Sequence, residues 1–116
     1  MTVDVLGTEY KIIIDDFNCD LLAGANRSGY CFFDAAEIHI EDLDTDNDWK
    51  NESEEVKKKQ HKKILRHELI HAFLYESGLH ANSCSVHAWA GNEEMIDWFA
   101  LQMPKLIRAF EVTGCI

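Results

Sequence analysis

The chain has little proline and few basic residues, and it lacks a long apolar run. Pro104 is the only proline in 116 residues, so no proline-rich linker divides the sequence. No stretch approaches the roughly 20 apolar residues that span a bilayer, and no basic region precedes an apolar block at the N-terminus. We therefore expect one domain over residues 1–116, in a cytoplasmic protein that makes no membrane contact.

Cysteine is also sparse, and its spacing excludes the usual paired motifs. The four cysteines, Cys19, Cys31, Cys84 and Cys115, form no C-x-x-C pair. A chain of this length does not need disulfides to hold a core, so free thiols are expected. Cys84 is three residues from His87, which makes these two side chains a candidate pair of metal ligands.

Acidic residues outnumber basic ones by 21 to 11, which gives a formal charge of −10. This excess argues against nucleic acid as the main partner, because the phosphate backbone attracts basic surfaces. Most of the bases lie in K-K-K-Q-H-K-K-I-L-R at 57–66, directly after Glu52, Glu54 and Glu55. Acids at a helix start suit the helix dipole, so we interpret the basic run as the solvated face of a helix.

Alternating and β-branched residues predict strands in the first third of the chain. Residues 2–14 alternate in polarity and indicate a strand or a tight hairpin near Leu6 and Gly7. Residues 15–29 are typical of turns with one short helical piece, and residues 30–42 contain a further strand with Ile38 and Ile40 on one face.

Two helices are predicted in the rest of the chain. The first extends from about Ser53 to Ser77 and is ended by Gly78 in a left-handed cap. The second follows Asn92, a good N-cap residue, and contains Pro104, a candidate kink. Its predicted core face is the apolar stripe Ile96, Phe99, Met103, Ile107 and Phe110.

An H-E-x-x-H motif lies inside the first helix, in R-H-E-L-I-H at 66–71. His67 and His71 are four residues apart, so they share one helix face and can offer two nitrogens to one ion. Glu68 is offset enough to miss the ion and to reach a water bound to it, which is the geometry of a general base. Zinc in such a site lowers the pKa of its water to about 7 and polarises a carbonyl. The apolar flanks favour this interpretation over chance, because unpaired buried imidazoles are costly.

A catalytic zinc needs a third protein ligand and one open position. The metzincin pattern is excluded, because Leu74 and Ser77 stand where it requires glycine and histidine. Glu93 and Asp97 are four residues apart on the second helix, so one can bind zinc while the other orients a ligating histidine. Alternatively, acids at this helix start only cap it. The candidates are His80, Cys84, His87, Glu93, Glu94 and Asp97.

The segment H-E-L-I-H and the later E-E-M-I-D-W-F-A-L-Q-M-P resemble the gluzincin-type metallopeptidases, in particular the small ImmA/IrrE-like proteins and related phage-encoded proteins. The resemblance covers about the C-terminal half of the chain. Ile70 departs from the glycine that the family often has, and Asp97 departs from its common asparagine. The resemblance implies a minimal zincin-like α+β domain, in which a small, mostly antiparallel sheet packs on an active-site helix and a glutamate-bearing C-terminal helix.

The resemblance also implies roles for individual residues. It assigns His67, His71 and Glu93 as Zn²⁺ ligands, Glu68 as general base and acid, and Asp97 as the partner of a ligating histidine. His87 is the first candidate for an oxyanion donor, with His80 as the alternative. His39 and His61 are interpreted as surface residues.

The expected function is hydrolysis of peptide bonds in a protein or peptide substrate, including a regulatory protein. If A-E-I-H-I at 36–40 is an edge strand, an extended peptide can add to it by main-chain hydrogen bonds. One alternative is a metal-stabilised, non-catalytic module that binds a protein without cutting it. Another is an adaptor that uses the basic run at 57–66.

Overall fold

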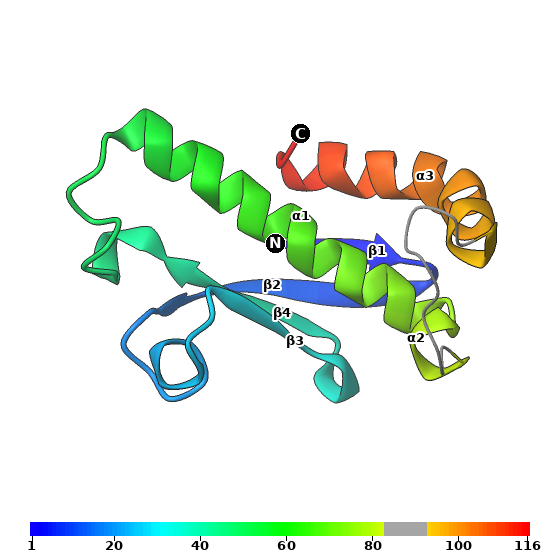
Figure 1. The fold of residues 1–116 in the computed structure, drawn as a ribbon, viewed down its shortest axis with the longest axis horizontal. Helices are drawn as coiled ribbons and strands as arrows, with labels where there is room; N and C mark the ends of the chain where they lie inside the picture. The colour runs from blue at the N-terminus through cyan, green and yellow to red at the C-terminus, as the bar shows by residue number, and fades with distance from the viewer. Residues whose placement is uncertain (83–92) are drawn as a thin grey trace.

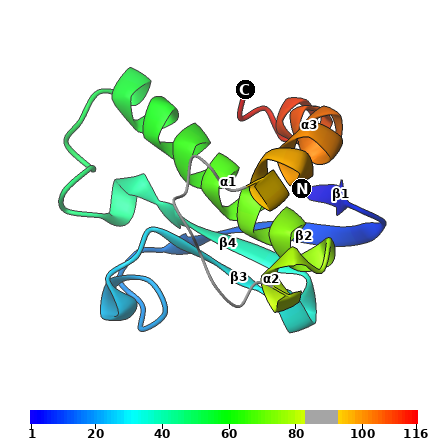
Figure 2. The same ribbon diagram turned by 45° about the vertical axis from the view of Figure 1, so that its right-hand side comes forward.

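The computed structural model describes residues 1–82 and 93–116, without the side chains of Asn82, Glu93, Ile96, Asp97 and Ala100. Four strands form one sheet, and the two long helices lie together on one of its faces (Figures 1 and 2). The strands are β1 (Thr2–Val5), β2 (Thr8–Asp16), β3 (Gly29–Phe32) and β4 (Glu37–Asp42). The helices are α1 (Glu54–Glu76), α2 (Leu79–Asn82) and α3 (Glu93–Thr113).

The sheet has the order β1-β2-β4-β3 and is mixed. The outer pairs are antiparallel, whereas β2 and β4 run parallel, with Ile12 opposite Ile38. The expected small α+β domain is therefore confirmed at this coarse level. The expectation that 36–40 forms an edge strand is wrong, because β4 lies between β2 and β3. In the described part of the chain, the sheet edge beside α1 belongs to β3 and is free.

Two tight turns produce this strand order. Leu6 and Gly7 connect β1 to β2 with φ of 53° and 95°, as the predicted hairpin requires. Between β3 and β4, the short 3-10 turn η2 (Phe33–Ala35) is followed by Ala36 at a φ of 53°. The segment predicted to contain one strand thus holds the expected strand, β4, and a second strand, β3, that folds back on it.

The core lies between the sheet and the two long helices. Ile38 and Ile40 are fully buried on the helix-facing side of β4, as the alternation predicted. Leu69 and Phe73 of α1 meet them from above and are 0% and 1% exposed. Each side chain of this size contributes about 1.5–3 kcal/mol by leaving water, so this layer fixes α1 against the sheet.

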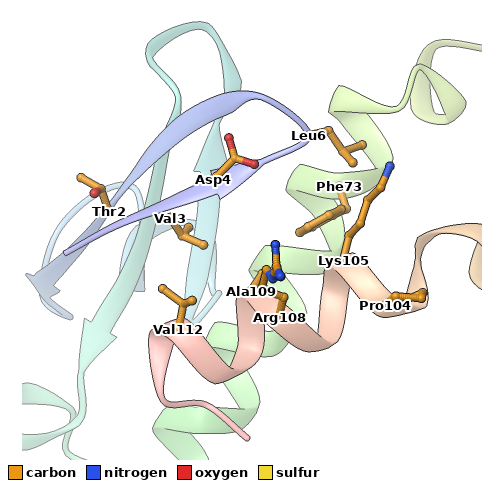
Figure 3. A pocket seen from close by; sticks show the side chains of 10 residues that line it. All are labelled: Thr2, Val3, Asp4, Leu6, Phe73, Pro104, Lys105, Arg108, Ala109 and Val112. Carbon is orange, nitrogen blue, oxygen red and sulfur yellow. The ribbon is translucent and has the colours of Figure 1, made fainter.

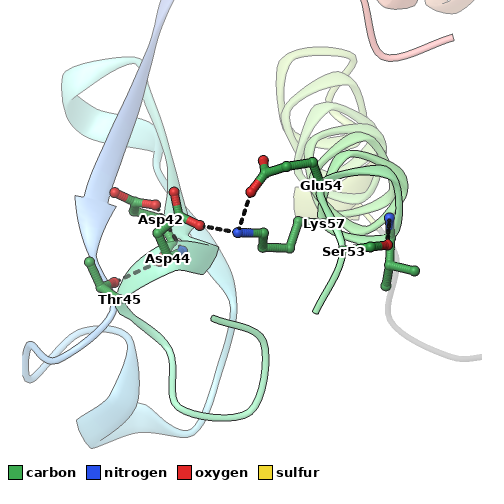
Figure 4. A network of polar contacts seen from close by, with 7 residues as sticks. Asp42, Asp44, Thr45, Ser53, Glu54 and Lys57 are labelled. Carbon is green, nitrogen blue, oxygen red and sulfur yellow. Dashed lines mark hydrogen bonds and ion pairs between the residues drawn. The ribbon is translucent and has the colours of Figure 1, made fainter. Parts of the chain in front are cut away.

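Helix α1 begins where the sequence indicated. The Oγ of Ser53 accepts a hydrogen bond from the Val56 amide at 3.2 Å, which caps the first turn. Lys57 pairs with Asp44 and with Glu54 (Figure 4) and is only 8% exposed. The basic run is therefore solvated at the exposed Lys58, Lys59 and Lys63 but not at Lys57.

Helix α3 buries only part of the predicted core stripe. Met103 and Ile107 are 39% and 40% exposed, so this part of the predicted core stripe is wrong. Phe110, at the end of the predicted stripe, is buried as expected. The other buried apolar residues among the described side chains of α3 are Trp98, Leu106 and Ala109. Apolar side chains surround most of this helix, so its sequence period does not specify which side packs on α1 and β1. The helix continues through Pro104, and the side chain of Ile96 and the whole of Asn92 lie outside what the structure describes.

Glu41, near the end of β4, is a buried acid. It is 1% exposed, and neither side-chain oxygen has a hydrogen-bond partner among the described residues. The pKa of Glu41 is raised from 4.5 to about 7, mainly by burial, with Ser28 acting in the opposite direction and Asp46 adding to the rise. Because the folded state then holds a proton that the unfolded state releases, its stability falls as the pH rises from about 4.5 to about 7.

We therefore expect Glu41→Gln to stabilise the protein at pH 8, where the buried carboxylate is charged, by about 1–3 kcal/mol. At pH 4, both side chains are neutral, and the two proteins are expected to unfold at similar temperatures. Thermal unfolding of both proteins at the two pH values measures this difference. A melting temperature that does not rise at pH 8 would contradict it.

Candidate metal centre

His67 and His71 converge on one face of α1. Their Nε2 atoms lie 3.0 Å apart, their rings meet edge to face, and both side chains are exposed. Two nitrogens held about 2.0–2.1 Å from one tetrahedral ion lie about 3.3 Å apart. The pair therefore needs only a small adjustment to hold one ion.

Glu68 lies beside this pair but points toward the sheet. Its side chain is 5% exposed and packs against the edge strand β3. The Sγ of Cys31 lies 3.2 Å from the Glu68 carbonyl oxygen and 3.6 Å from its Oε2. A Cβ atom added to Gly29 would lie 3.1 Å from both Cγ and Oε1 of Glu68. The two positions of β3 that face α1 thus hold the carboxylate.

The surroundings of Glu68 change its acidity. Burial raises the pKa of Glu68, while His67, His71 and then Cys31 act in the opposite direction. Burial and the nearby Glu68 raise the pKa of the Cys31 thiol well above its usual value. Cys31 therefore stays protonated at neutral pH, which suits a weak donor to Glu68 and not a thiolate metal ligand.

The sequence did not indicate the role of Gly29, which leads to a prediction. We expect Gly29→Ala to destabilise the fold by about 1–3 kcal/mol, because its methyl group would overlap Glu68 and lie 2.9 Å from the His39 carbonyl oxygen. Gly24→Ala is the matched control, since a Cβ there has no neighbour closer than 3.6 Å. Urea unfolding of both variants measures the effect. Equal stability of the two would contradict the close packing of Glu68 on β3.

The described residues supply two nitrogen donors and a carboxylate, but not a complete ligand set. Among them, no three His, Cys, Asp or Glu side chains gather around one point. His80 lies near the rings of Phe33 and Tyr75, and Glu94 is exposed. Residues 83–92, with the candidates Cys84 and His87, and the side chains of Glu93 and Asp97 lie outside the description. The third ligand and the oxyanion donor therefore stay predictions.

The two remaining histidines are less exposed than expected. The side chain of His39 is 12% exposed, so its interpretation as a surface residue is wrong. Its Nδ1 lies 2.6 Å from Asp15 Oδ2, its Nε2 lies 2.8 Å from Glu37 Oε2, and its ring stacks on Tyr30. His61 is half-buried, and this burial lowers its pKa. Neither histidine is therefore the fully exposed surface residue that the sequence had suggested.

The prediction of free thiols is confirmed for the cysteines that the structure describes. Cys19, Cys31 and Cys115 are free, and Cys84 lies outside the described residues.

Two hollows in the surface bear on function. A pocket of about 240 Å³ lies beside His67 and Glu68 and extends toward Arg27 and Lys63. A larger hollow of about 710 Å³ lies between β1 and α3 (Figure 3). Among the described residues that line it, Asp4 is the only carboxylate and there is no histidine or cysteine. The smaller pocket is therefore the one next to the metal-binding chemistry.

Comparison with known proteins does not assign the chain. It matches no protein-family model, and no curated protein or solved structure is significantly similar. In the described part of the chain, no helix combines the length and apolarity needed to cross a membrane.

Proposed function

We propose that this protein is a zinc-dependent peptidase that hydrolyses peptide bonds of a protein or peptide substrate. The observation that carries the proposal is the convergence of His67 and His71, with Nε2 atoms 3.0 Å apart, beside the buried Glu68. Two imidazoles at this spacing suit one Zn²⁺, and a neighbouring carboxylate suits proton transfer. A regulatory protein is among the substrates that the proposal covers.

The zinc ligands in this proposal are His67, His71 and Glu93, and Asp97 orients one of the histidines. The donor chemistry fits zinc, since imidazole nitrogens and a carboxylate oxygen are among its usual ligands. When bound, zinc supplies an acidified water molecule and polarises the substrate carbonyl. The backbone supports the role of Glu93 only in that α3 begins at this residue.

Glu68 carries the proton transfer. A carboxylate whose pKa is raised by burial is a stronger base than an exposed one, so it accepts a proton from the attacking water more readily. The same group then donates the proton to the leaving amine. Cys31 and Gly29 limit where the carboxylate can lie, so that it stays beside the two histidines.

The free edge of β3 is the proposed substrate platform. One side of β3 pairs with β4, and no strand among residues 1–82 and 93–116 pairs with its other edge. An extended peptide can pair with such an edge through main-chain hydrogen bonds. The residues that hold Glu68 belong to this strand, so the bound peptide would lie next to the base.

A metal-stabilised binding module is the second candidate. The observation in its favour is the same free edge of β3, which can bind a peptide whether or not it is cut. The test that separates the two is zinc-dependent cleavage of a peptide library by the wild-type chain and by Glu68→Gln. A peptidase loses cleavage in the variant, whereas a binding module has no cleavage to lose.

A further inference from the structure

The pocket beside His67 and Glu68 has the size and position of a side-chain site. At about 240 Å³ it is smaller than the roughly 300–1,000 Å³ of pockets for drug-sized ligands. One wall comes from the residues that lead into β3, and the other comes from one face of α1. The lining residues other than His67 and Glu68 are Arg27, Ser28, Gly29, Gln60, Lys63 and Ile64.

Two cations on opposite walls and one carboxylate, that of Glu68, line this pocket, so positive charge is in excess there. Arg27 and Lys63 both line it, and neither forms an ion pair within the described part of the chain. The chain as a whole carries a formal charge of −10. Two cations without an ion pair beside one pocket are therefore unusual for this acidic protein. An anionic group that enters the pocket would meet both of them.

Arg27 is held in place before any ligand arrives. Its Nε donates a hydrogen bond to the carbonyl oxygen of Leu21 at 2.7 Å, and its guanidinium lies 4.6 Å from the centre of the Tyr30 ring. A cation oriented in this way loses less conformational freedom on binding than a free side chain. The pocket is therefore partly organised for an anion.

We propose that this pocket binds an aspartate or glutamate side chain of the peptide substrate. The identification of the ligand as a substrate rests on the proposed function, whereas the binding itself does not require cleavage. The pocket adjoins the start of β3, and a peptide antiparallel to β3 places its C-terminal half there. We expect this antiparallel orientation because antiparallel strand pairs are commoner than parallel ones. The acidic residue then lies on the C-terminal side of the scissile bond.

The test compares two blocked hexapeptides that differ only in glutamate or glutamine at the fourth position. Binding is followed by amide chemical shifts of the Glu68→Gln protein, which keeps the peptide intact. We expect shifts at Gly29 and Lys63, with at least tenfold tighter binding of the glutamate peptide. In that protein, Lys63→Glu is expected to abolish the preference. Lys59→Glu, at an exposed position of α1 outside the pocket lining, is expected to preserve it.

Equal binding of both peptides, or no shifts at Gly29 and Lys63, would overturn the acidic-side-chain site. Failure of the proposed function gives a different pattern. Zinc-dependent cleavage without any preference for acidic residues removes the side-chain site and retains the peptidase. Selective binding of the glutamate peptide, without zinc-dependent cleavage of any library peptide, supports the site and removes the peptidase.

Discussion

Replacement of Glu68 by glutamine is expected to reduce peptide hydrolysis by about 10²- to 10⁴-fold, the range associated with loss of a general base and acid. Glutamine has nearly the same shape and stays uncharged, so the buried position beside Cys31 and Gly29 should accept it. Its amide cannot take a proton from water at neutral pH. We therefore expect loss of turnover without loss of fold.

The measurement is kcat/KM for a fluorogenic peptide selected from a library with the wild-type chain. Zinc content and melting temperature are measured on the same samples. Glu55→Gln is the matched control, because Glu55 is an exposed acid in the first turn of the same helix. Hydrolysis by Glu68→Gln at the wild-type rate would exclude Glu68 as the base. Loss of zinc or fold in that variant would indicate a structural role instead.

Removal of His71 is expected to weaken zinc binding by more than about 100-fold. Loss of a group that only orients a ligand typically costs 10–100-fold, and loss of a ligand should cost more. The side chain is exposed and packs little, so His71→Ala should barely change the stability of the metal-free protein. Zinc that binds only the folded state raises the free energy of unfolding by about 4 kcal/mol when its concentration is a thousand times its Kd. This stabilisation should disappear in His71→Ala.

Titration calorimetry with zinc and thermal unfolding with and without zinc measure these effects. His80→Ala is the control, because His80 is exposed and lies near Phe33 and Tyr75, away from the His67–His71 pair. Wild-type zinc affinity in His71→Ala would contradict the proposed centre. A loss of affinity in His80→Ala as large as in His71→Ala would contradict Glu93 as the third ligand and favour His80.

The sequence predicted α1 well because local chemistry determines it. Ser53 caps the start, Gly78 at a φ of 81° follows the end, and the spacing of His67 and His71 places them on one face. Each of these features depends on residues within one or two turns of helix. The agreement of capping, pattern and motif in one segment made the prediction specific.

The edge strand and the buried face of α3 depend on distant contacts, and the sequence did not specify them. Ala36 takes a left-handed conformation that glycine or asparagine usually adopts, so the turn between β3 and β4 had no recognisable residue. The pairing of β3 with β4 becomes visible only in the assembled sheet. The close approach of Glu68 and His39 that requires glycine at position 29 depends on this pairing. The buried face of α3 is likewise selected by α1 and β1 through Leu106 and Ala109.

The most direct test of the central claim is the coordination of zinc in crystals of the zinc-loaded protein, located by anomalous scattering. The account predicts one zinc per chain, bound by the Nε2 atoms of His67 and His71, by one carboxylate oxygen of Glu93 and by water. A zinc held by four protein donors, or by donors that exclude the two histidines, would contradict it.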